Sequence, residues 1–147
     1  MGYLPMFGDE LMPTNHFDYE MSELADRHYS RRTPGTRQFL YSGRKLVLRN
    51  DAGTVLFGWV YPEPDMRMDG QSGVNCAIFR NESARKASEI ILEAEDWAQR
   101  KWGRQRLYTY VDPRKVKGNP PGNCFLRAGW RFMRLSKSGQ HLLAKEG

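Results

Sequence analysis

The longest amphipathic stretch of the chain runs from Ser83 to Trp102, and it is the feature that most limits the available folds. Asn81 or Ser83 can cap its first turn, and Gly103 can supply a left-handed residue after its last turn. The pattern predicts one helix with a single buried face. The residues of that face recur at intervals of three and four: Ala84, Ala87, Ile90, Ile91, Ala94, Trp97 and Ala98.

Apolar segments on both sides of this helix predict the strands of a sheet. Residues 50–53, Asn-Asp-Ala-Gly, are strong turn formers, so the segments around them are expected to form an antiparallel hairpin. Shorter helices are expected at Phe17–Tyr29, with Asn15 as the cap, and at Asn123–Ala128. The predicted strands are residues 45–49, 54–61, 74–79, 106–112, 131–137 and 141–144.

A chain of 147 residues is expected to form one domain, which we place at residues 17–147 after an extended N-terminal arm of residues 1–16. No apolar run approaches the roughly 18 residues that a membrane-spanning helix needs, and the N-terminus lacks the pattern of a secretion signal. Cys76 and Cys124 have neither metal-ligand spacing nor the density of a disulfide scaffold, so no metal site is expected. We therefore expect a cytoplasmic location and no membrane partner.

The net charge of +6 is unevenly distributed along the chain. Residues 1–26 carry six acids and no Lys or Arg, whereas residues 27–49 carry seven Lys or Arg and no acid. Residues 113–137 again carry seven basic residues and no acid. Two acid-free basic segments in a small domain favour a polyanionic partner over a basic surface without a role, and nucleic acid is the commonest such partner.

The predicted order of elements resembles the GNAT (Gcn5-related N-acetyltransferase) fold over about residues 17–145. The resemblance implies an α/β (α+β) fold, with a mixed, mostly antiparallel sheet flanked by helices in a single domain. In that fold the third strand leads into a pyrophosphate-binding loop at the long helix, which implies acetyl-CoA or a related phosphate-bearing donor as the cofactor. Residues 125–130, Phe-Leu-Arg-Ala-Gly-Trp, are similar to the family's Tyr-Glu-Lys-x-Gly-Phe stretch.

The chain departs from the family pattern in two places. Arg80 stands at the head of the loop motif Gln/Arg-x-x-Gly-x-Gly/Ala, but Ser83 and Arg85 occupy its two small positions. The tyrosine that usually serves as general acid falls on Phe125, which has no proton to give. These departures argue against ordinary acetyl-CoA chemistry.

A narrower resemblance accounts for these departures. Short blocks in the same order are similar to the phage Mu Mom protein and its relatives, a GNAT-like family that converts adenine in DNA to a carbamoylmethyl-adenine and so protects phage DNA from restriction. This resemblance implies a transferase that acts on adenine in double-stranded DNA. Two alternatives stay open: a GNAT acyltransferase for a small amine or a protein, and a GNAT-like module that binds nucleic acid without catalysis. The matching blocks are residues 26–30, 79–82, 110–113, 119–125 and 128–130.

The candidate catalytic residues lie at the ends of predicted elements. His28 and Tyr29, at the end of the first helix, are a candidate proton-handling pair, although a histidine there can simply favour the helix dipole. Asp112, at the end of the central strand, is a candidate base or amine-binding group, or equally a residue that starts a turn. Tyr108 and Tyr110 alternate on that strand and face the same way. Tyr110 completes the candidate catalytic set, although core packing is the more usual fate of such a tyrosine.

Two helix starts beyond strand ends are candidate sites for the phosphates of a cofactor, because exposed backbone N–H groups collect there. A thiol at the start of the short helix, Cys124, would have a lowered pKa, although an inert buried cysteine beside Phe125 is the commoner case. The candidate cofactor-binding residues are Arg80, Asn81, Ser83, Ser88, Gly122, Asn123 and Cys124.

Basic residues in the loops that flank this region are predicted to bind DNA. An enzyme that acts on the N6 atom of adenine in a duplex must extrude the base, and an aromatic or arginine side chain must hold it. Tyr29, Tyr41 and Trp59 are candidates for that platform, whereas Trp97 and Trp130 are expected in the core. The candidate DNA-binding residues are Arg31, Arg32, Arg37, Arg114, Lys115 and Lys117.

Overall fold

The computed structural model describes residues 10–15, 17–27, 40–67, 70–116 and 120–147. Its centre is one seven-stranded sheet in the order β1-β2-β3-β4-β5-β7-β6, in which β4 and β5 are parallel and the other neighbouring pairs are antiparallel. The strands are β1 Met12–Thr14, β2 Arg44–Arg49, β3 Val55–Tyr61, β4 Val74–Asn81, β5 Leu107–Val111, β6 Arg131–Leu135 and β7 His141–Lys145. The helices are α1 Tyr19–Asp26, α2 Ala87–Trp102 and α3 Asn123–Arg127, with a short 3₁₀ turn at Pro64–Met66. This confirms the mixed, mostly antiparallel sheet and the single domain.

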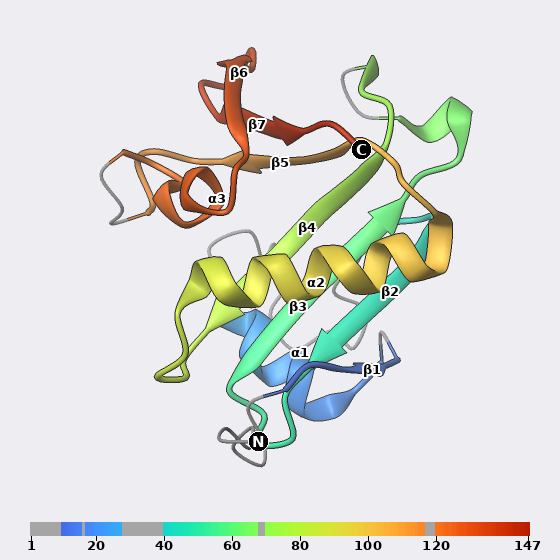
Figure 1. Ribbon diagram of the computed structural model, residues 1–147, viewed down its shortest axis with the longest axis vertical. Coiled ribbons are helices and arrows are strands. Elements are labelled where there is room, and N and C mark those ends of the chain that lie inside the picture. Colours follow the sequence, from blue (N-terminus) through green and yellow to red (C-terminus); the bar gives the residue numbers. More distant parts are fainter. Residues whose placement is uncertain (1–9, 16, 28–39, 68–69, 117–119) are drawn as a thin grey trace, which may run out of the picture.

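Helices cover both faces of the sheet: α2 crosses one face and α1 lies against the other (Figure 1). The apolar side of α2 buries Ile90 and Ile91 against Phe57 and Trp59 of β3. The main core therefore lies between α2 and the sheet. Burial of side chains of this size contributes about 1.5–3 kcal/mol each. Among the described residues, no helix is long and apolar enough to cross a membrane.

A smaller core lies under α1 on the opposite face. The side chain of Asp18 caps this helix by accepting the N–H of Met21 at 3.1 Å. Asn15, the predicted cap, instead accepts the N–H of Phe17 at 2.6 Å, before the helix begins. That prediction was wrong, because Asp18 lies closer to Met21, the first buried residue of the helix, and takes the capping position. The buried residues of this core are Met21, Leu24, Ala25, Leu40, Val47, Leu56, Val60 and Ile78.

The hairpin of β2 and β3 confirms the prediction made from residues 50–53. Asn50 is fully buried in the turn, and its side-chain oxygen accepts the N–H groups of Thr54 and Val55 at 2.9 Å each. The edge strand β1 was not predicted, and it lies within the range expected to be an arm. Met-Pro-Thr has no alternating pattern of its own, so only its pairing with β2 defines this strand.

The long helix begins at Ala87, not at Ser83 as predicted. The carboxamide of Asn81 accounts for the difference, because it accepts the N–H of Ser83 at 2.9 Å and donates to the carbonyl of Arg85 at 2.8 Å. Such local side-chain bonds compete with helical ones, and they hold residues 82–86 as a loop. Lys86 becomes the residue before the helix, with an extended backbone and no side-chain cap.

Candidate functional site

The parallel strands β4 and β5 are neighbours over only part of their length. They pair along Val74–Cys76 and Leu107–Thr109. Beyond these pairs β4 runs on to Asn81 and β5 to Val111 without pairing to each other, and the strands point apart (Figure 1). Ligands of sheets with parallel strands commonly bind outside the carboxyl ends of strands that part in this way. The parting of β4 and β5 is therefore the candidate site.

An extra residue in β4 lies next to the last β4–β5 pair. Trp59 of β3 faces Cys76 and Gly58 faces Ile78, so Ala77 between them has no partner on β3. A β-bulge of this kind bends its strand, and bulges are common beside active sites. Gly58 suits this position because a Cβ there would lie 2.9 Å from a methyl group of Ile78. The bulge thus marks where β4 leaves β5.

The start of α2 lies beyond the end of β4. The first N–H groups of any helix have no partner inside it, and Lys86 adds no side-chain cap. The N–H groups of Ser83 and Arg85 in the preceding loop are used by Asn81 Oδ1 and by Ser83 Oγ, at 2.9 and 3.2 Å. An anion would therefore meet the first turn of α2, which includes Ser88, with the exposed Lys86 beside it. Lys86 was not predicted as a site residue, because the apolar pattern places the helix start too early.

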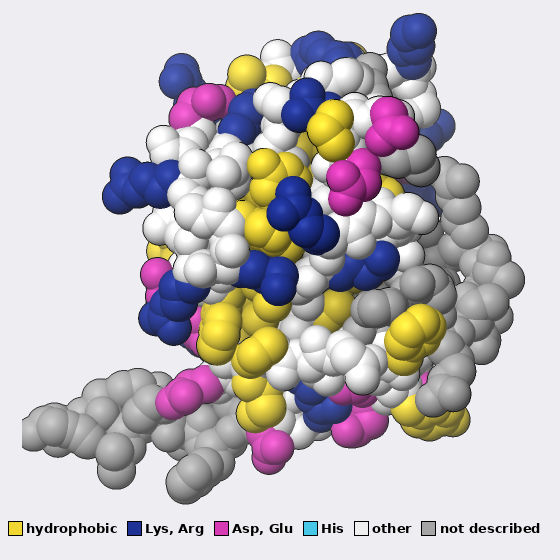
Figure 2. All heavy atoms as spheres, turned by 90° about the vertical axis from the view of Figure 1, so that its right-hand side faces the viewer, with side chains coloured by type: hydrophobic (Ala, Val, Ile, Leu, Met, Phe, Trp, Pro, Cys, Tyr) yellow, Lys and Arg dark blue, Asp and Glu magenta, His cyan; other side chains and the backbone are white. Residues whose placement is uncertain are grey.

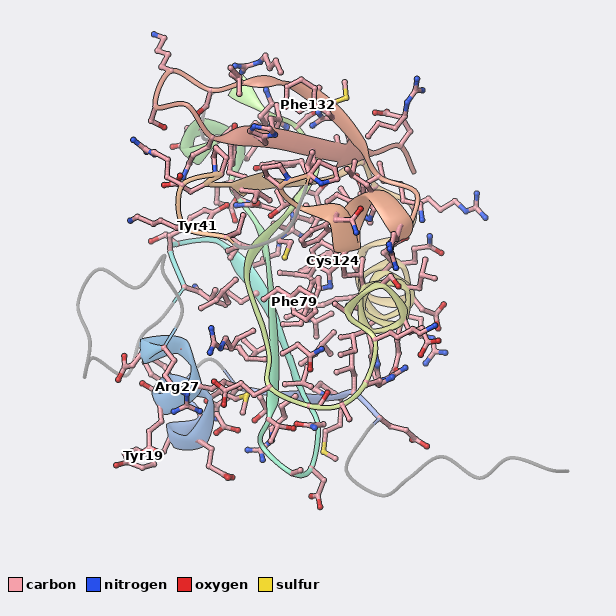
Figure 3. All side chains as sticks on the ribbon, turned by 90° about the vertical axis from the view of Figure 1, so that its left-hand side faces the viewer. Tyr19, Arg27, Tyr41, Phe79, Cys124 and Phe132 are labelled. Atoms are coloured by element: carbon pink, nitrogen blue, oxygen red, sulfur yellow. The ribbon has the colours of Figure 1, made fainter. Side chains whose placement is uncertain are left out.

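Carboxylates pair with the arginines in and beside this loop. Arg80 and Arg27 both donate to Glu82, Arg80 at 3.0 Å and Arg27 at 2.8 and 3.1 Å. The hydrogen bond from Arg27, together with that from Arg80, holds the pKa of Glu82 below its usual value, so the carboxylate stays charged. Arg85 pairs with Glu93 of α2 at 2.6 Å. The Arg27 bond ties the end of α1 to the loop after β4. Figure 3 shows Arg27 at α1.

The start of α3 faces the same region from the other side. Gly122 has a left-handed backbone with φ of 72°, and a Cβ there would lie 2.5 Å from Leu143, so this turn needs glycine. Asn123 is the first helical residue, and Cys124 follows it, packed with Phe79 against the core under α2 (Figure 3). Burial raises the pKa of the Cys124 thiol. Of the two alternatives drawn from the sequence, the buried, inert cysteine agrees with this direction, because burial outweighs the short helix.

Phe125 is part of the core. Its side chain is buried, and its ring meets Phe79 and Trp130 edge-on with centroids 6.1 and 4.8 Å apart. A tyrosine hydroxyl at this position would have to find room among aromatic rings. The position where the usual acyltransferase tyrosine falls is here a packing position.

Asp112 is buried at the end of β5 and starts a turn. Its carboxylate accepts the backbone N–H of Arg114 at 3.0 Å and the guanidinium of the same residue at 3.1 Å. These bonds from Arg114 lower the pKa of Asp112, so it is a charged group and a weak base at neutral pH. Tyr110 is half-buried, and its ring meets Tyr108 edge-on at 6.1 Å.

Several predicted site residues lie outside the described part of the chain: His28, Tyr29, Arg31, Arg32, Arg37 and Lys117. Trp59 was a candidate for stacking a base, and that prediction was wrong, because Trp59 is fully buried and its indole N–H donates to Ala94. Strand alternation shows which residues share a side of the sheet, but it does not show which side a helix will cover. Tyr41 is half-buried and accepts a hydrogen bond from the side chain of Asn75 at 2.8 Å, and Trp130 is buried as predicted.

No protein-family model and no curated protein matches this sequence. Two solved structures match its fold over nearly the whole chain. One, from Bordetella pertussis, is described as a GnaT-family acetyltransferase, with 14% identity, a TM-score of 0.61, and 97% of this chain and 98% of that chain covered. The other is an acyl-CoA N-acyltransferase from Pseudomonas aeruginosa, with 14% identity, a TM-score of 0.54, and 94% and 99% covered.

The chain therefore has the GNAT acetyltransferase fold. At this level of identity the likeness establishes the fold, and function has to be argued from the site. These comparisons give no support to the narrower resemblance to phage Mom proteins.

Proposed function

We propose that the protein is a GNAT-type transferase that moves an acyl group from a CoA thioester to an amine. The observation that carries this proposal is the parting of β4 and β5 at the bulge of Ala77, with the uncapped start of α2 beyond the end of β4. An extended thioester donor needs both features: a gap between strands for its acyl arm and backbone N–H groups for its phosphates.

The start of α2 fits the phosphates of CoA. Lys86 is exposed there, and no ion pair of Lys86 occurs within the described part of the chain. Gly122 opens α3 on the opposite side of the parting. Bound CoA would supply the activated acyl group, and the residues of this chain would hold its diphosphate and orient the acceptor.

Proton transfer has to use a group other than the one usual for the fold, because Phe125 stands in its place. Burial raises the pKa values of Tyr41, Tyr108 and Cys124, so these groups stay protonated at neutral pH. The predicted pair of His28 and Tyr29 remains the candidate for accepting the proton of the amine, together with Tyr110. His28 follows Arg27, which is bonded to the loop after β4.

Acetyl-CoA binding measured by titration calorimetry tests the donor site. Lys86→Ala should weaken binding about tenfold, because a charge-assisted contact to phosphate contributes roughly 1.5–3 kcal/mol. Lys101→Ala is the matched control at the other end of the same helix, where Lys101 lies over the Trp102 ring at 5.6 Å, and it should bind as the wild type does. Absence of binding to the wild type, or an equal loss in both variants, would contradict the donor site.

A second candidate function is modification of adenine in double-stranded DNA. The observation that favours it is the charge of residues 113–137, seven basic residues and no acid. Arg127, Arg131 and Lys137 in this segment are exposed, and the described residues offer them no ion pair. The face drawn in Figure 2 carries its Lys and Arg side chains in separate groups. The exposed arginines and lysine of the segment around α3 and β6 are therefore where a DNA footprint is expected.

Mass spectrometry of nucleosides from cells that express the protein tests this second function. A new adenosine derivative, together with resistance of the DNA to restriction at adenine-containing sites, is the expected result. If the protein is produced and the digests contain only the four ordinary nucleosides, the DNA-modifying function fails and the acyltransferase proposal is unaffected.

A further inference from the structure

The two edges of the sheet differ in how well they are protected against another strand. The sheet ends at β1 on one side and at β6 on the other (Figure 1). β1 has three residues, and its Pro13 has no N–H to donate, so this edge is short and blunted. β6 has five residues, Arg131–Leu135, without proline or glycine, and no described strand pairs with its outer side. The outer side of β6 therefore presents backbone donors and acceptors without strand partners.

The side chains of β6 are all exposed, and three of them are large and apolar. Phe132, Met133 and Leu135 are 50%, 50% and 56% exposed. Single exposed apolar residues are normal on protein surfaces, but three within five residues of an open edge are typical of a docking surface. Figure 3 shows Phe132 at the end of the molecule opposite Tyr19 of α1.

The register with β7 places two of these apolar side chains on the α2 side of the sheet. Phe132 pairs with Leu143, which belongs to the core under α2, and Leu135 pairs with His141, two residues from Leu143. Cross-strand partners share a side of the sheet, and so do residues two apart on one strand. Phe132 and Leu135 share a side although they are three residues apart, because Met133 between them is the extra residue of a bulge.

The arginines of β6 lie on the opposite side of the sheet. Arg131 pairs with Ala144 and Arg134 with Leu142, and these two partners belong to a cluster outside the core under α2. The described residues offer Arg131 no ion pair, and residues 113–145 include no acid. The open edge of β6 is therefore apolar on one side of the sheet and basic on the other.

We propose that the open edge of β6 binds an extended acidic segment of a partner protein as an added strand. Backbone groups of the segment pair with those of β6, its acidic side chains lie beside Arg131 and Arg134, and its apolar side chains cover Phe132 and Leu135. This edge is two strands away from β5 and the parting of β4 and β5, so the inference is independent of the proposed transferase function.

The charges of β6 favour such a partner over a second copy of this chain. Charged side chains and bulges are common protections of an edge strand against pairing with itself. An antiparallel pair of two β6 strands would place the arginines of both copies on the same side, where like charges destabilise the pair. An acidic strand at the same edge meets these arginines with the opposite charge.

The apolar side and the open backbone favour a peptide over nucleic acid. Phosphates of a nucleic acid would pair with Arg131 and with the nearby Arg127, but they offer no strand that could complete the hydrogen bonds of the edge. They would also leave Leu135 exposed. A peptide strand engages the backbone, the arginines and the apolar side chains together.

Fluorescence titration with two synthetic peptides tests the inference. Their sequences are Glu-Val-Glu-Ile-Glu-Val-Glu and Lys-Val-Lys-Ile-Lys-Val-Lys, with blocked ends. The wild type should bind the acidic peptide at least about tenfold more tightly than the basic one. An acidic peptide with N-methyl groups on alternate peptide nitrogens cannot complete the strand pairing, and at least one of its two alternating forms should bind about tenfold more weakly.

Variants of the protein locate the binding surface. Arg131→Glu should weaken the acidic peptide at least about tenfold, because it replaces attraction by repulsion. Arg104→Glu, at an exposed arginine after α2, is the matched control with the same change in net charge, and it should bind as the wild type does. Leu135→Ser should weaken binding about fivefold, because the peptide then buries less apolar surface. All three positions are exposed, so the melting temperatures should match the wild type.

Amide hydrogen exchange with and without the acidic peptide tests whether a strand is added. Exchange should slow within Arg131–Leu135 and stay unchanged in β1. Failure of the acidic peptide to bind, equal binding of both peptides, or binding without protection of β6 would overturn the inference. Sedimentation of the protein alone and with a short DNA duplex tests the other occupants. Self-association that Arg131→Glu alters, or DNA binding that depends on Arg131 in a protein that ignores the peptide, would also overturn it.

Discussion

Two buried polar clusters of this protein differ in whether their hydrogen bonds are complete. On the α2 side, Glu95 is 6% exposed and accepts the indole N–H of Trp130 at 2.9 Å and the ammonium of Lys145 at 2.8 Å. Lys145 also donates to the carbonyl of Ala128 at 2.9 Å. On the α1 side, Asn75 Oδ1 has no partner among the described residues, and the Tyr108 hydroxyl has only the Tyr41 hydroxyl beside it. Complete bonding is typical of a structural cluster, whereas incomplete bonding in a native protein points to a ligand, a water molecule or catalysis.

The largest effect is expected on the complete cluster. Glu95→Ala should lower the free energy of unfolding by about 3 kcal/mol, because it leaves the Trp130 and Lys145 groups without their shared acceptor. Glu89→Ala, an exposed acid of the same helix, is the control and should change stability by less than about 0.5 kcal/mol. Urea unfolding measures both. A loss below about 1 kcal/mol for Glu95→Ala would place this cluster in the same class as the other.

An intermediate effect is expected at Asp18, whose bonds are complete but lie near the surface. Burial alone would raise the pKa of Asp18, but hydrogen bonds from Thr14, Arg49 and the N–H of Met21 outweigh it and lower the pKa. A lowered pKa in the folded state stabilises the protein above the unfolded value of about 3.9, and the contribution is lost as the pH falls through the folded value. Asp18→Asn should therefore cost about 1 kcal/mol at pH 7, and urea unfolding near pH 2 should show a smaller difference from the wild type. An equal difference at both pH values would mean that the charge of Asp18 contributes nothing.

The smallest effect is expected on the incomplete cluster. Tyr108→Phe removes a hydroxyl whose one polar neighbour is the hydroxyl of the half-buried Tyr41, so the free energy of unfolding should change by less than about 1 kcal/mol. Thermal and urea unfolding of the ligand-free protein measure it. A loss of more than about 1 kcal/mol would show that this hydroxyl stabilises the fold as strongly as a complete cluster does, and the contrast between the two clusters would then disappear.

The parts of the fold that depend on local sequence could be predicted. The β2–β3 hairpin follows from its turn residues, and α3 and β4 follow from short apolar patterns with clear ends. The start of α2 could not be predicted, because one side chain, Asn81, holds the preceding loop out of the helix. The strand β1 could not be predicted either, because its three residues are a strand only by virtue of β2.

The candidate site was predicted only in outline. Its expected position at the ends of β4 and β5 follows from the order of elements, and the structure places Phe125, the predicted departure from the family pattern, in the core. The pairing of Asn75 with Tyr108 depends on the register between strands 33 positions apart, which no local pattern encodes. The bulge at Ala77 is likewise set by the partner strand. Lys86 lies at the helix start only because α2 begins later than the apolar pattern predicts.

The parallel pairing of β4 with β5 is a seam between two antiparallel halves of the sheet, β1 to β4 and β5 to β7. On the α2 side the bonds of Glu95 connect the two halves. Glu95 belongs to the helix that follows β4, whereas its partners Trp130 and Lys145 belong to the second half. On the α1 side the aligned residues Asn75 and Tyr108 do not bond to each other, and the half-buried Tyr41 hydroxyl is the weaker connection between them. The two halves should therefore rotate about the Glu95 side as a hinge and open toward α1. Amide hydrogen exchange should then be faster at Asn75 and Cys76 than in the interior of the β2–β3 hairpin.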